Sequence, residues 1–324
     1  MSIQEQWAHR SLVCARAGLE VGCHDVDPAR LERARSELRA RSDRDGENGW
    51  IDATENMAAW DRLRFSAELT ELASDVDLVI EAAVEKLLVR LDLFAAQDRL
   101  TSANAILASN SLSFVPSRLA TATGLPDKVC NMHFFSPALV MKCVEVVPGP
   151  DTSSKTMEIV AELTQRLGKI PVVLNKETPG FVENRILNAV RDEAISLLEG
   201  GVASVEAIDV ACSTALGYPV GPFGLMDLTG IDIGYYIKQE RFAEVHDPAD
   251  APSRSVVELV ERGISAARLD AAGTSTTAPV TRSHPPRVRR VTSIPKATRK
   301  KGPYDDHSQG AARLVRYGRS VGGR

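Results

Sequence analysis

A histidine and a glutamate, twelve positions apart, are the residues of this 324-residue chain best suited to acid–base chemistry. His133 lies in the apolar run 132–135 and Glu145 in the apolar run 143–147, and the short loop between these runs brings them together as neighbouring strands. A buried carboxylate without a partner is costly, so a neighbouring imidazole would explain Glu145. Such a pair makes a base, because the carboxylate fixes the tautomer and stabilises the imidazolium. The alternative is a hydrogen-bonded core histidine, with Glu145 turned to water on the other strand face.

Three more polar residues, Asp25, Glu85 and Asn110, stand at or just beyond the ends of predicted strands. Ligands of an open parallel sheet bind outside the carboxyl ends of its strands, where helix N-termini present free N–H groups. Asp25 is placed to accept hydrogen bonds from both ribose hydroxyls of NAD and to repel the extra phosphate of NADP. The alternative for Asp25 is a solvated turn acid next to Pro28.

The elements that position these residues alternate between strand and helix. Residues 19–27 alternate apolar and polar like a short strand, and Pro28 opens a helix to about residue 41. Further strands are predicted at 75–83, 105–110, 129–135, 142–147 and 171–174, and further helices at 86–100, 117–123 and 155–167. Segment 43–60 has no clear period and is expected to be a loop with a poor helix. This alternation predicts an α/β fold with a doubly wound sheet.

The pattern changes at the turn signal Thr178-Pro179-Gly180. Helical periodicity follows at 181–198 and 204–216. We therefore expect a first domain over 1–179, a smaller all-helical domain over 180–263, and a tail over 264–324.

Composition separates the tail from the rest of the chain. Residues 271–324 hold 12 Lys/Arg and 2 Asp/Glu, so the net charge of −4 combines a body near −14 with a tail near +10. The tail has too little apolar surface to offset its ordering entropy and is expected to be disordered.

With 44% hydrophobic residues the chain as a whole has a composition typical of globular proteins. No apolar run approaches the ~20 residues of a membrane span. The five cysteines show no metal-ligand spacing, which predicts reduced thiols and no metal site. The start lacks a secretory pattern, so we expect a cytoplasmic protein.

Six motifs in residues 12–262 together resemble the NAD-dependent (S)-3-hydroxyacyl-CoA dehydrogenases, particularly the free-standing 3-hydroxybutyryl-CoA type. The motifs are Asp75-Val76-Asp77-Leu78-Val79-Ile80-Glu81-Ala82, Ile106-Leu107-Ala108-Ser109-Asn110, Asn131-Met132-His133-Phe134-Phe135-Ser136-Pro137, Met141-Lys142-Cys143-Val144-Glu145-Val146-Val147, Pro179-Gly180-Phe181-Val182-Glu183-Asn184-Arg185 and Gly221-Pro222-Phe223-Gly224-Leu225-Met226-Asp227. The resemblance implies a Rossmann-like domain followed by a helical domain through which two subunits usually pair, an oxidoreductase activity, and a role in fatty-acid or butanoate-type metabolism.

The resemblance also assigns roles to particular residues. His133 looks like the general base and Glu145 its partner, so that His133 takes the 3-hydroxyl proton while C3 passes hydride to the nicotinamide, leaving a 3-ketoacyl-CoA. Asn184 looks like a polar group that places substrate and His133. The cofactor-contacting positions of the family match Asp25, Glu85 and Asn110, and also Arg90, which stands where the family usually has a lysine.

Three departures from the family pattern qualify these expectations. The substrate-binding serine of the family falls on Leu112, which cannot donate a hydrogen bond to a developing ketone oxygen. Ser111 or Ser113 could replace it if the loop shifts by one residue. The first strand and its Gly-x-Gly-x-x-Gly turn are absent, so the pyrophosphate loses its backbone cradle and the sheet its central strand.

The third departure is the ending, because the family pattern stops at residue 263. The codons of residues 264–277 can be chosen so that, read from an offset frame, they spell the ending expected of the family. We therefore hypothesise that the tail is a frameshift product, which the nucleotide sequence would test.

Two other functions stay open at the sequence level. One is a dehydrogenase of a hydroxy acid without CoA, of the carnitine or gulonate type. The other is a family member that has lost its chemistry, with a basic tail able to bind a polyanion. We expect an acyl-CoA substrate, a homodimer formed through the helical domain, no membrane partner, and no nucleic-acid partner despite the basic tail.

Overall fold

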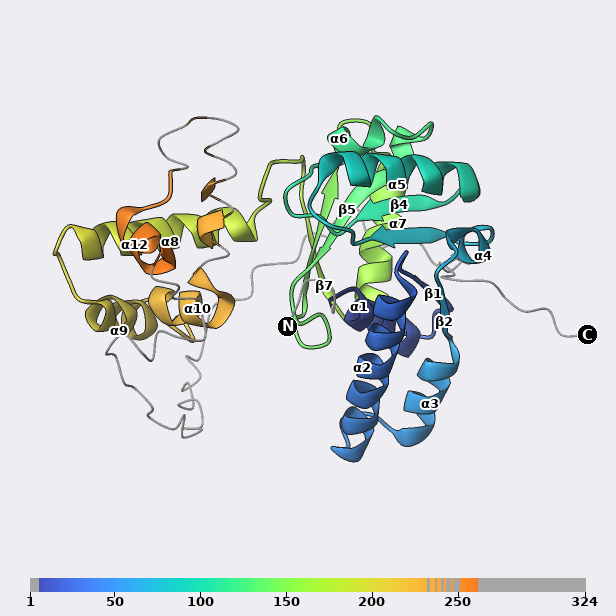
Figure 1. Cartoon of the computed structure of the whole chain (residues 1–324), viewed down its shortest axis with the longest axis horizontal. Coiled ribbons are helices and arrows are strands. Elements are labelled where there is room, and N and C mark those ends of the chain that lie inside the picture. The colour runs from blue at the N-terminus through green and yellow to red at the C-terminus, as the bar shows by residue number, and fades with distance from the viewer. Residues whose placement is uncertain are drawn as a thin grey trace, which may run out of the picture. The chain divides into compact units, whose positions relative to one another are not determined.

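The computed structural model of the chain describes residues 6–231, 234–236, 238, 239, 242, 246 and 251–261 (Figure 1). The chain divides into two compact units, and the division falls between Phe181 and Val182. The basic tail expected at 264–324 lies outside the described residues.

The strands of the first unit form two sheets. They are β1 (Val21–His24), β2 (Leu63–Ser66), β3 (Leu78–Glu81), β4 (Ile106–Ser109), β5 (Val129–Phe134), β6 (Cys143–Pro148) and β7 (Ile170–Val173). The parallel strands β1 and β2 pair with each other, while β3 to β7 form a five-stranded sheet in sequence order. In that sheet only β5 and β6 pair antiparallel. The prediction of a mainly parallel α/β sheet is therefore confirmed, and among the described residues the sheet is divided into these two separately paired parts.

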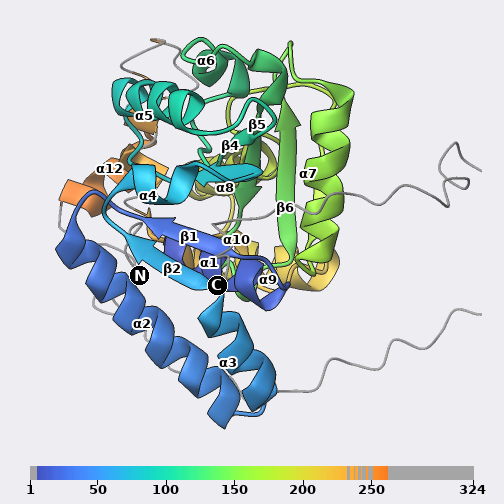
Figure 2. The same cartoon turned by 90° about the vertical axis from the view of Figure 1, so that its right-hand side faces the viewer.

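Helices connect these strands. They are α1 (Gln6–Arg16), α2 (Pro28–Glu47), α3 (Ala53–Asp61), α4 (Leu69–Ala73), α5 (Leu87–Leu100), α6 (Pro116–Ala120) and α7 (Ser154–Arg166), with a 3₁₀ turn at Pro126–Lys128. Figure 2 shows α7 lying along β6, and α2 beside α3 next to the small sheet.

Apolar side chains cover both faces of the larger sheet, which is why its strands read as continuous apolar runs. On β4, Ile106 and Ala108 point into a core shared with α1 and α7, whereas Leu107 points into a second core with Phe94 of α5 and Leu119 of α6. The first core also contains Val21 and Leu63 of the small sheet together with Leu78 of β3. One core therefore joins the two sheets, and helices lie on both faces of the larger one.

Segment 43–60, expected to be a loop with a poor helix, is more ordered than its pattern suggests. Helix α2 continues to Glu47, and the Asp52 side chain accepts hydrogen bonds from the N–H groups of Thr54 and Glu55 to begin α3. The expectation was wrong because α3 packs on α1 and α2, a tertiary contact that local periodicity does not encode. Strand β2 and helix α4 were also missed, because elements of four and five residues are too short to show a periodic pattern.

The second unit contains α8 (Glu183–Glu199), α9 (Val205–Ala215), α10 (Pro222–Thr229) and α12 (Arg254–Glu261). Helix α10 packs against both α8 and α9, and Ile195, Met226 and Val256 contribute to its small apolar cluster. Asp209 of α9 accepts hydrogen bonds from the N–H groups of Phe223 and Gly224, which satisfies the first turn of α10. Within the described ranges, no helix is long and apolar enough to cross a bilayer.

Candidate active site

His133 and Glu145 lie directly opposite each other on the antiparallel strands β5 and β6. The Nδ1 atom of His133 is 3.0 Å from Oε2 of Glu145, a hydrogen-bond distance. The residues are only 8% and 1% exposed, respectively. This register is needed for the contact, because a one-residue slip would turn one of the two side chains to the other face. The prediction that the two groups meet thus agrees with the structure, and the alternative with Glu145 turned to water does not.

Aromatic rings surround the imidazole of His133. The ring of Phe135 lies 4.8 Å from it and that of Phe181 lies 5.7 Å from it, centroid to centroid. Phe181 is fully buried and has a positive φ of 47°, an uncommon backbone conformation outside glycine. Because such conformations persist only when the surroundings over-determine them, the packing of this side chain beside His133 is a specified feature of the site. Sequence reasoning did not single out Phe181, although it follows Pro179-Gly180.

The arrangement divides the two imidazole nitrogens between two tasks. Glu145 holds Nδ1, which leaves Nε2 as the nitrogen able to accept a proton from a ligand. A carboxylate at hydrogen-bond distance favours the Nδ1–H tautomer and stabilises the cation that forms when Nε2 is protonated. The low exposure of both groups strengthens this interaction relative to water. The pair is chemically able to act as a general base.

Asn110 connects the end of β4 to the strand that carries His133. Its Oδ1 accepts a hydrogen bond of 2.9 Å from the N–H of Phe134, and its own N–H donates to the carbonyl oxygen of Glu81. The residue is half-buried and follows β4 directly, as predicted. Asn110 therefore holds three neighbouring strand ends in register, and its contact with a cofactor stays a prediction.

Asp25 follows β1, at the position predicted for a ribose-binding acid. Its Oδ1 accepts a hydrogen bond of 2.9 Å from the N–H of Asp27. The side chain of Asp27 caps α2, because its Oδ1 accepts hydrogen bonds from the N–H groups of Ala29 and Arg30. This geometry is an Asx turn that leads from the strand into the helix. The turn orients the Asp25 carboxylate at the carboxyl end of the strand and is compatible both with ribose binding and with a solvated turn acid.

Arg90 lies in the interior, where the prediction had placed a cofactor-contacting residue. It is 2% exposed, and its guanidinium pairs with Glu81 and, at 2.9 Å, with Glu85. Glu85 keeps its side chain 40% exposed, so of these charged groups it is the one that faces outward. Burial raises the pKa of Glu85, while Arg90 and a hydrogen bond from Ser111 act in the opposite direction. Sequence reasoning missed Glu81, although an acid that ends an apolar strand was a signal for a buried ion pair.

The serines around Leu112 occupy different environments. Ser111 is fully buried, and its hydroxyl donates to Glu85 and accepts from the N–H groups of Ser113 and Phe114. Ser113 is exposed. Leu112 packs in an apolar cluster with Phe181. The apolar Leu112 therefore lies next to the ring that contacts His133, and substrate binding by Ser111 or Ser113 stays a prediction.

Asn184 belongs to the second unit, where it lies in the first turn of α8 and is half-buried. Its proposed meeting with His133 concerns the placement of one unit relative to the other and stays a prediction.

Lys169 is a residue at the site that the sequence did not reveal. Its ammonium donates to the carbonyl oxygens of Ala138, at 2.6 Å, and Met141, at 2.9 Å. Both carbonyls lie in the loop that joins the strand of His133 to the strand of Glu145. Burial lowers the pKa of Lys169. The lysine therefore fixes the hairpin that sets the distance between the two acid–base groups.

Comparison with known proteins gives matches along most of the chain. The family described as "3-hydroxyacyl-CoA dehydrogenase, NAD binding domain" matches residues 5–178, and "3-hydroxyacyl-CoA dehydrogenase, C-terminal domain" matches residues 180–277. The chain is 36% identical to a probable 3-hydroxybutyryl-CoA dehydrogenase of Deinococcus radiodurans, covering 78% of this chain and 90% of that relative. It is 34% identical to the 5-formyl-3-hydroxy-2-methylpyridine 4-carboxylate 5-dehydrogenase of Mesorhizobium japonicum, covering 68% and 71%. The crystal structure of the (S)-3-hydroxybutyryl-CoA dehydrogenase of Ralstonia eutropha matches with a TM-score of 0.73 and 32% identity, covering 79% and 90%.

Proposed function

The chain belongs to the 3-hydroxyacyl-CoA dehydrogenase family of NAD-dependent oxidoreductases, and on that premise we propose that it oxidises an (S)-3-hydroxyacyl-CoA with His133 as the base and Glu145 as its partner. The observation that carries the proposal is the 3.0 Å contact between His133 Nδ1 and Glu145 Oε2 in a nearly buried setting. The names of the relatives in Deinococcus and Ralstonia support a short acyl chain such as 3-hydroxybutyryl.

The chain's own residues would move one proton in this reaction. Nε2 of His133 accepts the proton of the substrate 3-hydroxyl, and Glu145 stabilises the resulting imidazolium. NAD, when bound, supplies the hydride acceptor for C3. The rings of Phe135 and Phe181 limit the access of water to the imidazole. Asn184, at the start of α8, is proposed to hold the substrate oxygen. In the reverse direction His133 returns its proton to the 3-keto oxygen.

The residues present fit two parts of NAD. Asp25 follows β1 with one carboxylate oxygen engaged by a backbone N–H, which leaves the other for a ribose hydroxyl. Glu85 is partly exposed near the imidazole, and Asn110 ends the neighbouring strand, so both suit the nicotinamide half. The pyrophosphate part has less support, because residues 1–10 contain no glycine to form the turn before α1. We expect NAD binding that is weak for a Rossmann-like protein.

Activity on a defined substrate tests the proposal. The purified chain, with NAD and (S)-3-hydroxybutyryl-CoA, should produce NADH, and His133→Asn should reduce the rate by at least about a hundredfold. Glu158→Gln, on the exposed face of α7, serves as the control for handling and folding. A wild-type chain that binds no NADH in a fluorescence titration, or that is inactive in both directions, would place the protein among non-catalytic family members.

A second candidate function is a dehydrogenase of a hydroxy compound without CoA. The apolar environment of Leu112 beside Phe181 favours it, because the family resemblance implies a substrate-binding serine at this position. The relative in Mesorhizobium has a name without CoA, which supports this breadth within the family. Relative rates on (S)-3-hydroxybutyryl-CoA and on free hydroxy acids such as carnitine or gulonate distinguish the two functions.

We also propose a homodimer formed through the second unit. Large apolar side chains are exposed there on three helices: Ile186 on α8, Val210 on α9 and Leu228 on α10. Exposed apolar surface of this kind is typical of interaction sites. Light scattering on the purified chain tests the stoichiometry.

The buried thiols of Cys14, Cys23 and Cys130, whose pKa values burial raises to about 12, are consistent with a reducing compartment such as the cytoplasm.

A further inference from the structure

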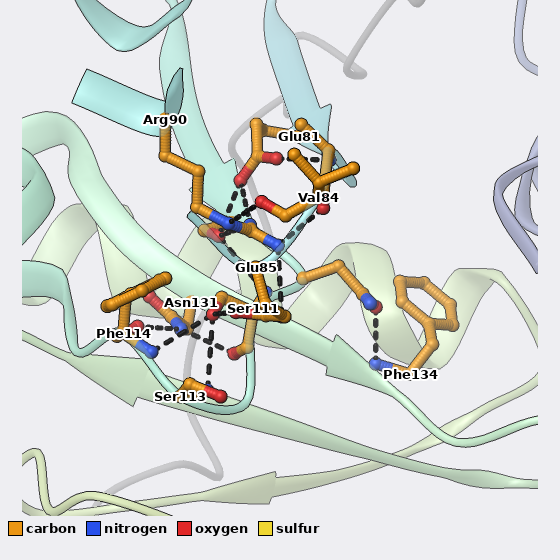
Figure 3. A network of polar contacts seen from close by, with 12 residues as sticks. Glu81, Val84, Glu85, Arg90, Ser111, Ser113, Phe114, Asn131 and Phe134 are labelled. Carbon is orange, nitrogen blue, oxygen red and sulfur yellow. Dashed lines mark hydrogen bonds and ion pairs between the residues drawn. The ribbon is translucent and has the colours of Figure 1, made fainter. Parts of the chain in front are cut away.

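Five hydrogen bonds converge on the side chain of Arg90 (Figure 3). Nε donates to the carbonyl oxygen of Val84 at 3.1 Å, and one terminal nitrogen donates to Glu81 and to the hydroxyl of Ser109. The other terminal nitrogen donates to the carbonyl oxygen of Ala83 at 2.6 Å and to Glu85 at 2.9 Å. A guanidinium has five N–H donors, so each of them has an acceptor here. Arg90 leaves no donor for a ligand.

The five acceptors come from one short stretch of chain and its neighbour. Four belong to residues 81–85, the end of β3 and the loop that follows it, and Ser109 ends β4. Glu81 also accepts a hydrogen bond of 2.8 Å from the Ser109 hydroxyl. Arg90 therefore fixes the shape of the loop after β3, and its charge compensates one of the two carboxylates there.

Glu85 is held at both of its oxygens. Oε1 accepts from Arg90 at 2.9 Å, and Oε2 accepts from the Ser111 hydroxyl at 2.9 Å. Figure 3 shows the carboxylates of Glu81 and Glu85 on either side of the guanidinium. An exposed glutamate ordinarily samples many rotamers, and restraining it costs about 1.5–2 kcal/mol of entropy. A partly exposed carboxylate with both oxygens bonded by protein groups is therefore preorganised for a ligand on its open side.

The network continues to the strand that carries the base. The hydroxyl oxygen of Ser111 accepts hydrogen bonds from the N–H groups of Ser113 and Phe114. The carbonyl oxygens of Ser111 and Phe114 in turn accept hydrogen bonds of 2.8 and 2.9 Å from Nδ2 of Asn131. Asn131 lies on β5, two positions before His133. The guanidinium of Arg90 also lies 5.8 Å from the ring centroid of Phe114.

We propose that Arg90 is a positioning residue, which orients the Glu85 carboxylate toward a bound dinucleotide and couples the loop after β3 to the strand of His133. The proposal rests on the proposed function, because it concerns NAD binding at the same site. It replaces the direct contact between residue 90 and the cofactor that the resemblance implied. Lysine at this position would keep the charge but supply only three donors from a single atom, and so leave acceptors in the loop unpaired.

A double-mutant cycle on NADH affinity tests the positioning role. Fluorescence titration measures the Kd of NADH for the wild type, Arg90→Lys, Glu85→Gln and the double variant. We expect Arg90→Lys alone to raise the Kd about thirtyfold, with kcat changed less than about threefold, because two lost hydrogen bonds of average strength correspond to about that factor. In the Glu85→Gln background, Arg90→Lys should change the Kd by less than about twofold. Arg99→Lys, the same substitution on the exposed side of α5, should change nothing and is the matched control.

The outcomes separate the proposals. Factors that multiply in the double variant would mean that Arg90 acts independently of Glu85, and would overturn the positioning role while leaving the proposed function intact. A wild-type chain without NADH binding would overturn both. If Arg90→Lys does not fold, Ser111→Ala removes the other restraint on Glu85. Ser111→Ala should raise the Kd of NADH several-fold when it is made in the wild-type background, and should have no effect when it is made in the Glu85→Gln background. If Ser111→Ala leaves the Kd of the wild-type background unchanged, the proposal is equally overturned.

Discussion

Replacement of Glu145 by glutamine separates the charge of the acid–base pair from its shape. Glutamine keeps the size of the side chain and an oxygen that can accept the Nδ1–H of His133, but it removes the negative charge beside the imidazole. The contact is 3.0 Å between Nδ1 and Oε2, and both residues are nearly buried. We therefore expect the effect to appear when the imidazolium forms.

The size of this effect follows from Coulomb's law. Two unit charges centred about 4 Å apart, at an effective dielectric constant of about 20, interact by about 4 kcal/mol. Since about 1.4 kcal/mol corresponds to a factor of ten in rate, Glu145→Gln should lower kcat about a thousandfold. Removing a buried charge relieves its desolvation, so the thermal stability of the variant should stay within a few degrees of that of the wild type.

The assay compares kcat and KM for NADH production with (S)-3-hydroxybutyryl-CoA, together with the Kd of NADH and the thermal transition. A low kcat with an unchanged Kd and an unchanged transition would agree with the reasoning. A folded Glu145→Gln variant that binds NADH and retains kcat within about threefold of the wild type would refute it. Glu158→Gln again provides the control, since that carboxylate is exposed on α7.

Three further predictions concern residues around the pair. Leu112→Ser should raise kcat/KM for 3-hydroxybutyryl-CoA about tenfold or more, because the serine supplies a hydrogen-bond donor. The same substitution should lower the free energy of unfolding by about 1–3 kcal/mol, because it removes apolar packing around Phe181. Steady-state kinetics measure the first effect and urea unfolding measures the second. Glu85→Gln should stabilise the chain near neutral pH, because burial raises the folded-state pKa of Glu85 above 4.5. The folded state then holds that proton more tightly than the unfolded state does. The wild-type free energy of unfolding therefore falls as the pH rises from about 4.5 through the raised pKa of the folded state. Urea melts between pH 4 and about 7 should show the gap between the two proteins widening with pH. Lys169→Met leaves the carbonyls of Ala138 and Met141 without their donor and should cost about 1–3 kcal/mol, measurable by thermal or urea unfolding, with an unchanged free energy counting against this role.

Sequence reasoning named both members of the pair but left a core histidine, with Glu145 turned to water, as the alternative, and the family resemblance supplied their roles. Continuous apolar runs identified the strands at 129–135 and 142–147, and their closeness in the chain predicted that the strands pair. The structure pairs the two strands antiparallel across the connection 135–142, in a register that places residue 133 opposite residue 145. The order of strands and helices around them was predictable in the same way, from periodicity and from turn signals at glycine and proline.

The role of Arg90 could not be obtained in that way. Its acceptors are spread from residue 81 to residue 109, and only the packing of β3, β4 and α5 brings them around one guanidinium. The sequence alone gave a basic residue at a family position, which suggested a direct cofactor contact. The fold decides that this charge is interior, and that Glu85 faces outward.

The sequence by itself determined the family and the alternation of the α/β unit, because both depend on residues close in the chain or on motifs of fixed spacing, whereas the contact of His133 with Glu145 comes from the structure. The tertiary structure alone decided which polar residues are buried as support and which remain partly exposed. It also decided that Phe181 and Lys169 shape the surroundings of His133. Burial and hydrogen bonding between distant segments are properties of the packed chain, and a linear pattern does not contain them.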